Sequence, residues 1–230
     1  FKMIALGAAT RSSDRHQGVG LLVDDRLGRT ALHAASDHDL WIGRPIEQSG
    51  VFPLAFEDGP DLGSRLAEWP ANHCVKVLAP VRTDDQPDVI AYHEAEIVRL
   101  ADACRQTGHE LLFEIITGNR DKSAAPPQVL ALMQRFYDLG VAPDWWKLEP
   151  VDDGGFWTGA GDIVRANDPH VQGIIVLGKE MPDEQLGRVL GVARAEPLVR
   201  GFAIGRTIFS EAAQQWFADK IDDQTAQDMM

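Results

Sequence analysis

Short apolar runs alternate with amphipathic stretches along this chain, and that alternation restricts the fold more than any other feature of the sequence. Seven such runs are bounded by turn-forming residues and are typical of strands. Strands that alternate with helices predict a parallel sheet, and near-continuous apolar runs indicate strands that are covered on both faces. The predicted strands span residues 18–25, 39–45, 73–80, 109–117, 144–150, 171–178 and 199–206.

Helical patterns fill several of the stretches between these runs. In residues 92–108, Ile97 and Leu100 recur on one face, and Gly108 is a typical helix end. Residues 126–140 begin with proline and end with glycine, which is the usual asymmetry of helix termini. Two further helices are predicted over 181–196 and 210–221, and three long loops over 48–62, 117–127 and 150–162.

The number of predicted strands indicates a barrel that lacks one strand. A (β/α)8 TIM barrel needs about eight strands, and a chain of 230 residues suits one such domain over 1–230. If residues 1–16 form the first helix, the missing first strand lies upstream of Phe1, and the chain is a fragment of a longer protein. A doubly wound open sheet is the alternative, but no glycine-rich phosphate turn follows the first run.

Charge and composition exclude several classes of protein. The net charge is −13 without a visible basic patch, so we expect no nucleic-acid partner. No run approaches the length of a membrane span, and no signal peptide opens the chain, which favours a cytoplasmic protein. Cys74 and Cys104 are not spaced as a metal or redox pair. The histidines lack close ligand spacing, so we expect neither a metal nor another cofactor.

Charged residues interrupt three consecutive predicted strands, where burial would be costly for an unpaired charge. They are Lys76, Glu114 and Lys147, and Glu149 follows Lys147 two residues later, on the same side of its strand. Because the three strands are neighbours, we expect these side chains to converge inside the mouth of the barrel. Barrel active sites lie at that end of the strands.

Two interpretations of this cluster stay open from the residues alone. Burial and a second ammonium group both lower the pKa of a lysine, so Lys147 beside Lys76 would be an activated amine that can attack a carbonyl. Glu114 would then carry protons. The alternative is a pair of structural salt bridges, Lys76–Glu114 and Lys147–Glu149, inside the barrel.

A candidate phosphate site lies at the ends of the last two predicted strands. Barrels often bind phosphate through the loops that follow these strands, where glycine admits backbone N–H groups and arginine binds the anion. Gly178, Gly205 and Arg206 stand at these positions, although a helix start with a surface arginine would look the same. In the segment GRPIE, Arg44 and Glu47 end an earlier strand on the catalytic side, and Arg44 is a candidate substrate contact or a surface ion-pair partner.

Several motifs also carry a family resemblance. The segments VKVLAPVRTDD, GHELLFEII, DWWKLEP, GIIVLGKEMPDEQL and PLVRGFAIGRTIF resemble the aldolase-like C-terminal domain of bifunctional 5-dehydro-2-deoxygluconokinase proteins of myo-inositol catabolism. The resemblance covers nearly the whole chain. It extends more distantly to the class I tagatose-bisphosphate aldolases, which are TIM barrels. The first strand of the family usually carries a DxR segment, and no such strand precedes Phe1 in this sequence.

The resemblance implies residue roles and a reaction. It implies that Lys147 forms the Schiff base, that Lys76 is the second lysine, that Glu114 transfers protons, and that Gly205 with Arg206 holds a substrate phosphate. The implied reaction cleaves 6-phospho-5-dehydro-2-deoxy-D-gluconate to dihydroxyacetone phosphate and malonate semialdehyde, without a metal. The implied partners are a sugar-phosphate substrate, a fused or associated sugar kinase, and further copies of the chain in a homo-oligomer.

Three functional hypotheses follow. The first is a class I, Schiff-base aldolase. The second is a non-catalytic sugar-phosphate-binding or scaffolding barrel that serves a sugar kinase. The third is a phosphosugar isomerase that uses Glu114 as a base, and release of an aldehyde fragment would separate the aldolase from it.

Overall fold

The fold is a curled parallel sheet with helices outside it, seen in a computed structural model that describes residues 1–57, 59–81, 85–117 and 125–230. Within these ranges the strands follow one another in sequence order, and each pairs in parallel with the next. They are β1 (Gly20–Leu22), β2 (Trp41–Pro45), β3 (His73–Ala79), β4 (Leu111–Ile115), β5 (Trp145–Leu148), β6 (Gly173–Leu177) and β7 (Val199–Ala203). All seven predicted strands are confirmed.

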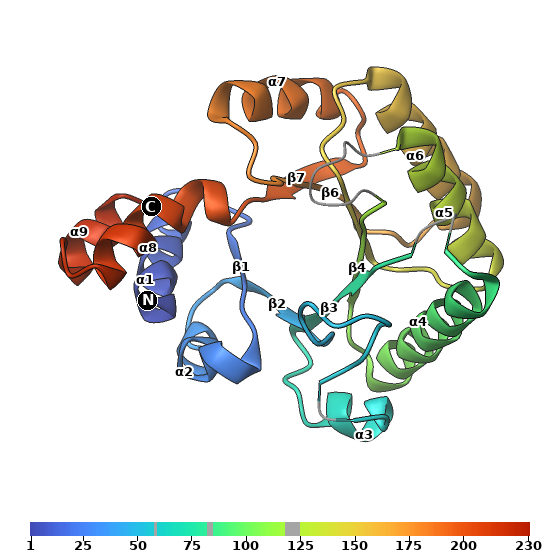
Figure 1. The fold of residues 1–230 in the computed structure, drawn as a ribbon, viewed down its shortest axis with the longest axis horizontal. Helices are drawn as coiled ribbons and strands as arrows, with labels where there is room; N and C mark the ends of the chain where they lie inside the picture. Colours follow the sequence, from blue (N-terminus) through green and yellow to red (C-terminus); the bar gives the residue numbers. More distant parts are fainter. Residues whose placement is uncertain (58, 82–84, 118–124) are drawn as a thin grey trace.

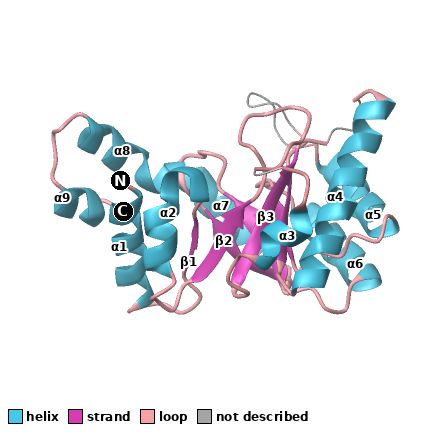
Figure 2. Ribbon diagram, turned by 90° about the horizontal axis from the view of Figure 1, so that it is seen from below, coloured by secondary structure: helices cyan, strands magenta, loops and turns pink. Residues whose placement is uncertain are grey.

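Helices connect the strands and surround the sheet (Figure 1, Figure 2). Helices α2 to α7 lie outside the sheet, whereas α1, α8 and α9 form a separate group beside β1, where α1 packs on α9 and α9 on α8. The helices of the described residues are α1 (Lys2–Ser13), α2 (Asp25–Ala35), α3 (Leu62–Ala67), α4 (Pro87–Thr107), α5 (Pro126–Asp138), α6 (Gly154–Asn167), α7 (Asp183–Ala193), α8 (Arg206–Phe217) and α9 (Asp223–Asp228).

This arrangement is a (β/α)8 barrel that lacks one strand, as expected. Parallel strands twist with a fixed hand, so a sheet with helices on its outer face curls toward closure. In the described residues β1 and β7 are the two ends of the sheet, and the remaining opening lies between them. The four predicted helices correspond to α4, α5, α7 and α8, and α4 ends at Gly108 with a left-handed φ of 75°.

The prediction of a loop over 150–162 was wrong, because α6 begins at Gly154. Its glycines lower helix propensity, but two stronger effects override them. The Asp153 carboxylate accepts a hydrogen bond from Gly155 N at 2.8 Å, and Phe156 and Trp157 bury one face of the helix. Of the other two predicted loops, 48–62 is irregular up to the start of α3, and 117–127 lies largely outside the described residues.

The two tryptophans of the DWWKLEP segment lie on opposite faces of the sheet. Trp146 is fully buried in the outer core, where it packs on Phe113 and donates to the Tyr137 hydroxyl at 2.7 Å. Trp145 faces inward and meets Trp41 edge-on across the lower part of the barrel, with 6.3 Å between ring centroids. Full burial of the Trp146 side chain stabilises the sheet by about 1.5–3 kcal/mol.

Cys74 and Cys104 are free thiols in the core. No helix in the described part of the chain combines the length and the apolar character needed to cross a membrane.

Candidate active site

Strand alternation places the charged residues on the inner face of the sheet. The register aligns Leu78 of β3 with Glu114 of β4, and Glu114 with Lys147 of β5. Their immediate neighbours Phe113 and Trp146 belong to the outer core, so Glu114 and Lys147 point inward. The expected convergence of these strands is therefore present in the structure.

Four side chains form one continuous chain of alternating charge across the inner face: Glu47, Lys76, Glu114 and Lys147. Glu114 Oε2 lies 3.0 Å from Lys76 Nζ and 3.2 Å from Lys147 Nζ. Lys76 Nζ also donates to Glu47 Oε1, beyond the end of β2. All four side chains are at most 11% exposed. Two ammonium and two carboxylate groups cancel in charge, which makes their joint burial tolerable.

The two lysines differ in the number of carboxylates that they contact. Burial opposes the charge of both, but Lys76 contacts Glu114 and Glu47, and these carboxylates raise its pKa above the ordinary value. Among the carboxylates of the described residues, Lys147 pairs with Glu114 alone, and it shares that group with Lys76. Burial therefore prevails at Lys147, the charge of Lys76 adds to it, and the pKa of Lys147 is lowered. Lys147 is the more readily deprotonated amine of the pair.

The two carboxyl groups of the charge chain, Glu114 and Glu47, also differ in the direction of their pKa shifts. Burial raises the pKa of Glu114, but the charges and hydrogen bonds of both lysines outweigh it, and the pKa is lowered overall. Burial likewise raises the pKa of Glu47, and Lys76 offsets it only in part, so this pKa stays above its ordinary value. Glu47 is therefore the carboxyl group that gains a proton more easily.

Glu149 is buried beside the Glu47–Lys76–Glu114–Lys147 charge chain but has partners of its own. Its Oε2 accepts hydrogen bonds from Thr117 N at 3.0 Å and Thr117 Oγ1 at 3.1 Å, and its Oε1 accepts from Lys179. The Lys76–Glu114 salt bridge of the structural alternative is thus present. The Lys147–Glu149 pairing of that alternative is wrong, since Lys147 binds Glu114 and Glu149 binds Lys179.

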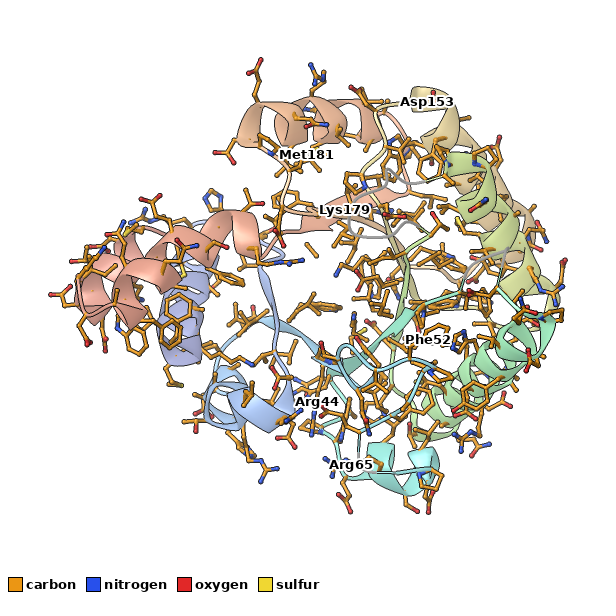
Figure 3. All side chains as sticks on the ribbon, in the orientation of Figure 1. Arg44, Phe52, Arg65, Asp153, Lys179 and Met181 are labelled. Atoms are coloured by element: carbon orange, nitrogen blue, oxygen red, sulfur yellow. The ribbon has the colours of Figure 1, made fainter. Side chains whose placement is uncertain are left out.

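Glu47 was expected on the catalytic side of its strand but, like Lys179, was not selected from the sequence as a site residue, although strand alternation could have identified both. Each stands just beyond a strand end, in the same phase as inward-facing residues of its strand. Figure 3 shows Lys179 at the β6 side of the barrel. Lys179 and Glu180 both have left-handed φ values, 52° and 55°, which non-glycine residues rarely adopt.

Gly178, Gly205 and Arg206 gather on one rim of the barrel, at the ends of β6 and β7. Gly178 N donates to Ala203 O at 3.2 Å, and Gly205 directly precedes α8. Arg206 is the first residue of α8; its side chain is 64% exposed and pairs with Glu180. The structure brings these three residues together at the C-terminal side of the strands, separate from the contacts of the lysines.

Arg44 is placed differently from the expected substrate contact. It lies on the outer face of β2, 3.1 Å from Asp25 of α2, with its guanidinium 3.8 Å above the Trp69 ring. Figure 3 shows it with Arg65 near helices α2 and α3. The phase of the strand explains this, because the inward positions around it are Gly43 and Pro45. The structure gives no support to a contact of Arg44 with substrate.

The described residues contain no cluster of three His, Cys, Asp or Glu side chains that could hold a metal ion. The described residues at this site offer a lysine with a lowered pKa, an adjacent charged lysine and two carboxyl groups.

Several solved structures with a similar fold are fructose-bisphosphate aldolases. A structure titled as a mechanistic study of the Schiff-base-forming fructose-1,6-bisphosphate aldolase has a TM-score of 0.61 and 13% identity, covering 89% of this chain and 75% of its own. The fructose-bisphosphate aldolase from Slackia heliotrinireducens DSM 20476 has a TM-score of 0.60 and 16% identity, and the match covers 100% of this chain and 76% of the aldolase. An archaeal fructose-1,6-bisphosphate aldolase with its catalytic lysine covalently bound to the carbinolamine intermediate has a TM-score of 0.59 and 12% identity. The match covers 91% of this chain and 76% of that enzyme.

At these identities the likeness establishes the barrel fold. No curated protein sequence matches the chain. One family model does match, over residues 1–230, and its description is "Uncharacterized protein conserved in bacteria (DUF2090)". The chain therefore belongs to the bacterial family DUF2090, and its fold is the barrel fold that these solved structures share.

Proposed function

We propose that this protein is a metal-independent class I aldolase in which Lys147 forms a Schiff base with a keto sugar phosphate. The observation that carries the proposal is the unequal pairing of the two buried lysines. Lys76 contacts two carboxylates, while Lys147 shares one, and the pKa of Lys147 is lowered. An amine that loses its proton more easily is the better nucleophile.

The same geometry supports the later steps of an aldolase. The neutral Lys147 amine adds to the substrate ketone, and the carbinolamine loses water to form a positively charged iminium. Glu114, 3.2 Å from Lys147 Nζ, remains an anion and stabilises that charge. The iminium then withdraws the electron pair of the carbon–carbon bond that breaks. The titles of the similar structures, which name a Schiff-base-forming aldolase and a carbinolamine on a catalytic lysine, agree with this chemistry.

The pairing also weighs against the isomerase hypothesis. An isomerase of this kind needs Glu114 as a base, but two ammonium groups hold its carboxylate and lower its pKa. A carboxylate stabilised as an anion is a weak base. Glu114 is better suited to hold the two lysines and the iminium than to abstract a proton from carbon.

The proposed substrate is 6-phospho-5-dehydro-2-deoxy-D-gluconate, and the products are dihydroxyacetone phosphate and malonate semialdehyde. The support for this substrate is the sequence resemblance to the aldolase-like domain of myo-inositol catabolism. Gly178, Gly205 and Arg206 on the rim are the proposed phosphate contacts, which requires Arg206 to exchange its Glu180 partner for the phosphate. The kinase association and the homo-oligomer stay predictions.

Borohydride trapping tests the proposal directly. The protein is incubated with dihydroxyacetone phosphate, reduced with borohydride, digested, and analysed by mass spectrometry. We expect a reduced adduct on the peptide that contains Lys147, and none in Lys147→Met. Saturable binding without an adduct, in a folded protein, would favour the non-catalytic sugar-phosphate-binding barrel instead.

A further inference from the structure

We propose that Glu47 is the acid–base catalyst of this site, which takes a proton from the substrate hydroxyl during cleavage and returns it to carbon afterwards. This inference rests on the proposed aldolase function. It assigns the proton transfer to a residue that follows β2, at the opposite end of the charge chain from Lys147.

The position of Glu47 agrees with the demands of the reaction. Carbon–carbon cleavage in a Schiff-base aldolase requires a base at the hydroxyl two carbons beyond the iminium carbon, and therefore not at the nucleophile itself. Lys147 contacts Glu114, Glu114 contacts Lys76, and Lys76 contacts Glu47. A substrate bound to Lys147 and extended across Lys76 would bring its hydroxyl toward Glu47.

One oxygen of Glu47 is available to a ligand. Oε1 binds Lys76, whereas Oε2 is buried and has no hydrogen-bond partner among the described residues. Buried carboxylate oxygens are nearly always paired, because an unpaired acceptor costs about 1–3 kcal/mol. A substrate hydroxyl at Oε2 would satisfy this atom. Glu114, in contrast, is held as an ion pair by both lysines.

The proton affinity of Glu47 suits a group that must hold and release a proton. Burial raises its pKa, and Lys76 only partly reverses the effect. The acid and the carboxylate forms are therefore closer in energy near neutral pH than they are for Glu114, whose pKa is lowered.

The backbone around Glu47 is held from both sides. Glu47 forms an antiparallel bridge with Phe56, and Ile46 N donates to Lys76 O at 3.0 Å. The loop between Glu47 and Phe56 is tied to α4, because Leu54 N donates a hydrogen bond to His93 Nε2 at 3.0 Å. Phe52 of the same loop packs edge-on against His93 and lies toward α4 in Figure 3. Such support preorganises the carboxyl group.

The proposed steps balance in atoms and electrons. The Glu47 carboxylate removes the hydroxyl proton, the O–H pair forms the new carbonyl, and the broken carbon–carbon pair neutralises the iminium to an enamine. After the aldehyde leaves, protonated Glu47 returns its proton to the enamine carbon, which restores both the iminium and the carboxylate. Water then hydrolyses the iminium to release the ketone and free Lys147.

Dihydroxyacetone phosphate alone separates this inference from the proposed function. Borohydride trapping reports the adduct on Lys147, and exchange of the substrate carbon-bound hydrogen in deuterium oxide, followed by proton NMR, reports transfer to and from carbon. We expect Glu47→Gln to keep the trapped adduct within about threefold at equilibrium and to slow exchange at least about 100-fold. Lys147→Met should lose both signals.

Controls make each outcome decisive. Glu184→Gln removes an exposed carboxylate of α7 and should leave both signals unchanged. The pH profile of exchange should lose one ionisation in Glu47→Gln. Glu47→Asp keeps a carboxyl group and should retain part of the exchange, and it remains a test if Glu47→Gln does not fold. Exchange at the wild-type rate in Glu47→Gln, or an unchanged pH profile, would overturn the role of Glu47 while leaving the Schiff base intact. Absence of an adduct in the wild-type protein would instead overturn the proposed function.

Discussion

Removal of the Lys76 charge should make Lys147 a weaker nucleophile. Both ammonium groups contact the same oxygen of Glu114, at 3.0 and 3.2 Å, so they repel one another within a buried site. In Lys76→Met this repulsion disappears, and Glu114 serves Lys147 alone. Both changes favour the protonated form of Lys147, and its pKa should rise.

The size of the effect follows from Coulomb's law. Two unit charges about 5 Å apart repel by roughly 3 kcal/mol at an effective dielectric constant of about 20. This energy corresponds to a rise of about 2 pH units in the midpoint of Lys147 ionisation. At pH 7 the neutral fraction of Lys147 would fall by roughly 100-fold.

Carbamylation by cyanate measures this ionisation, because cyanate is small and reacts with neutral amines. The rate at Lys147 is followed by peptide mass spectrometry as a function of pH in the wild-type protein and in Lys76→Met. The matched control is Lys220→Met, which removes an exposed lysine beyond α8 and should not move the midpoint. A midpoint in Lys76→Met at or below that of the wild-type protein would refute the electrostatic account of Lys147.

Three further predictions concern stability, each measured by urea unfolding. Glu114→Gln should lower the free energy of unfolding by about 3–5 kcal/mol at pH 7, because two buried ammonium groups lose their shared carboxylate, and a loss below about 1 kcal/mol would contradict the ion-pair geometry. Burial, assisted by the nearby positive charge of Arg44, lowers the pKa of His73 to about 4. The contribution of neutral His73 to the free energy of unfolding is therefore complete above pH 6.5 and is lost as the pH falls from 6.5 toward 4, by at most about 1.4 kcal/mol per pH unit. His73→Gln should remove this part of the dependence of the unfolding free energy on pH. An identical pH dependence in His73→Gln would exclude the contribution. Gly161→Ala should destabilise α6 by about 1–3 kcal/mol because its Cβ would overlap Glu196, while Gly187→Ala in α7 meets open space and should stabilise; equal effects would contradict this packing.

The fold was largely predictable because strand periodicity and turn residues are local properties. Every predicted strand is present, and the inward placement of Glu114 and Lys147 follows from their alternation with Phe113 and Trp146. The exception is α6. Its glycines argue against a helix, but the Asp153 cap and the burial of its aromatic residues make one stable.

The site was predictable in part. The grouping of Lys76, Glu114 and Lys147 followed from adjacent strands. Glu47 was expected on the catalytic side but was given no role, and the outward direction of Arg44 was not predicted. Both lie in or next to a five-residue strand, where an error of one residue in phase reverses which side chains face inward. Their partners, Lys76 for Glu47 and Asp25 with Trp69 for Arg44, come from distant parts of the chain.

The sequence by itself determined that lysines and glutamates would line the inside of a parallel barrel, because strand order and side-chain alternation are encoded locally. Only the tertiary structure decided that the ammonium group of Lys76 contacts two carboxylates, whereas that of Lys147 contacts one, which it shares with Lys76. That distinction depends on contacts between three strands and a loop, and on the low effective dielectric constant of a buried site, where differences of one contact decide the state of a proton. The number of carboxylate contacts therefore distinguishes Lys147 from Lys76, although both are single lysines within apolar strands.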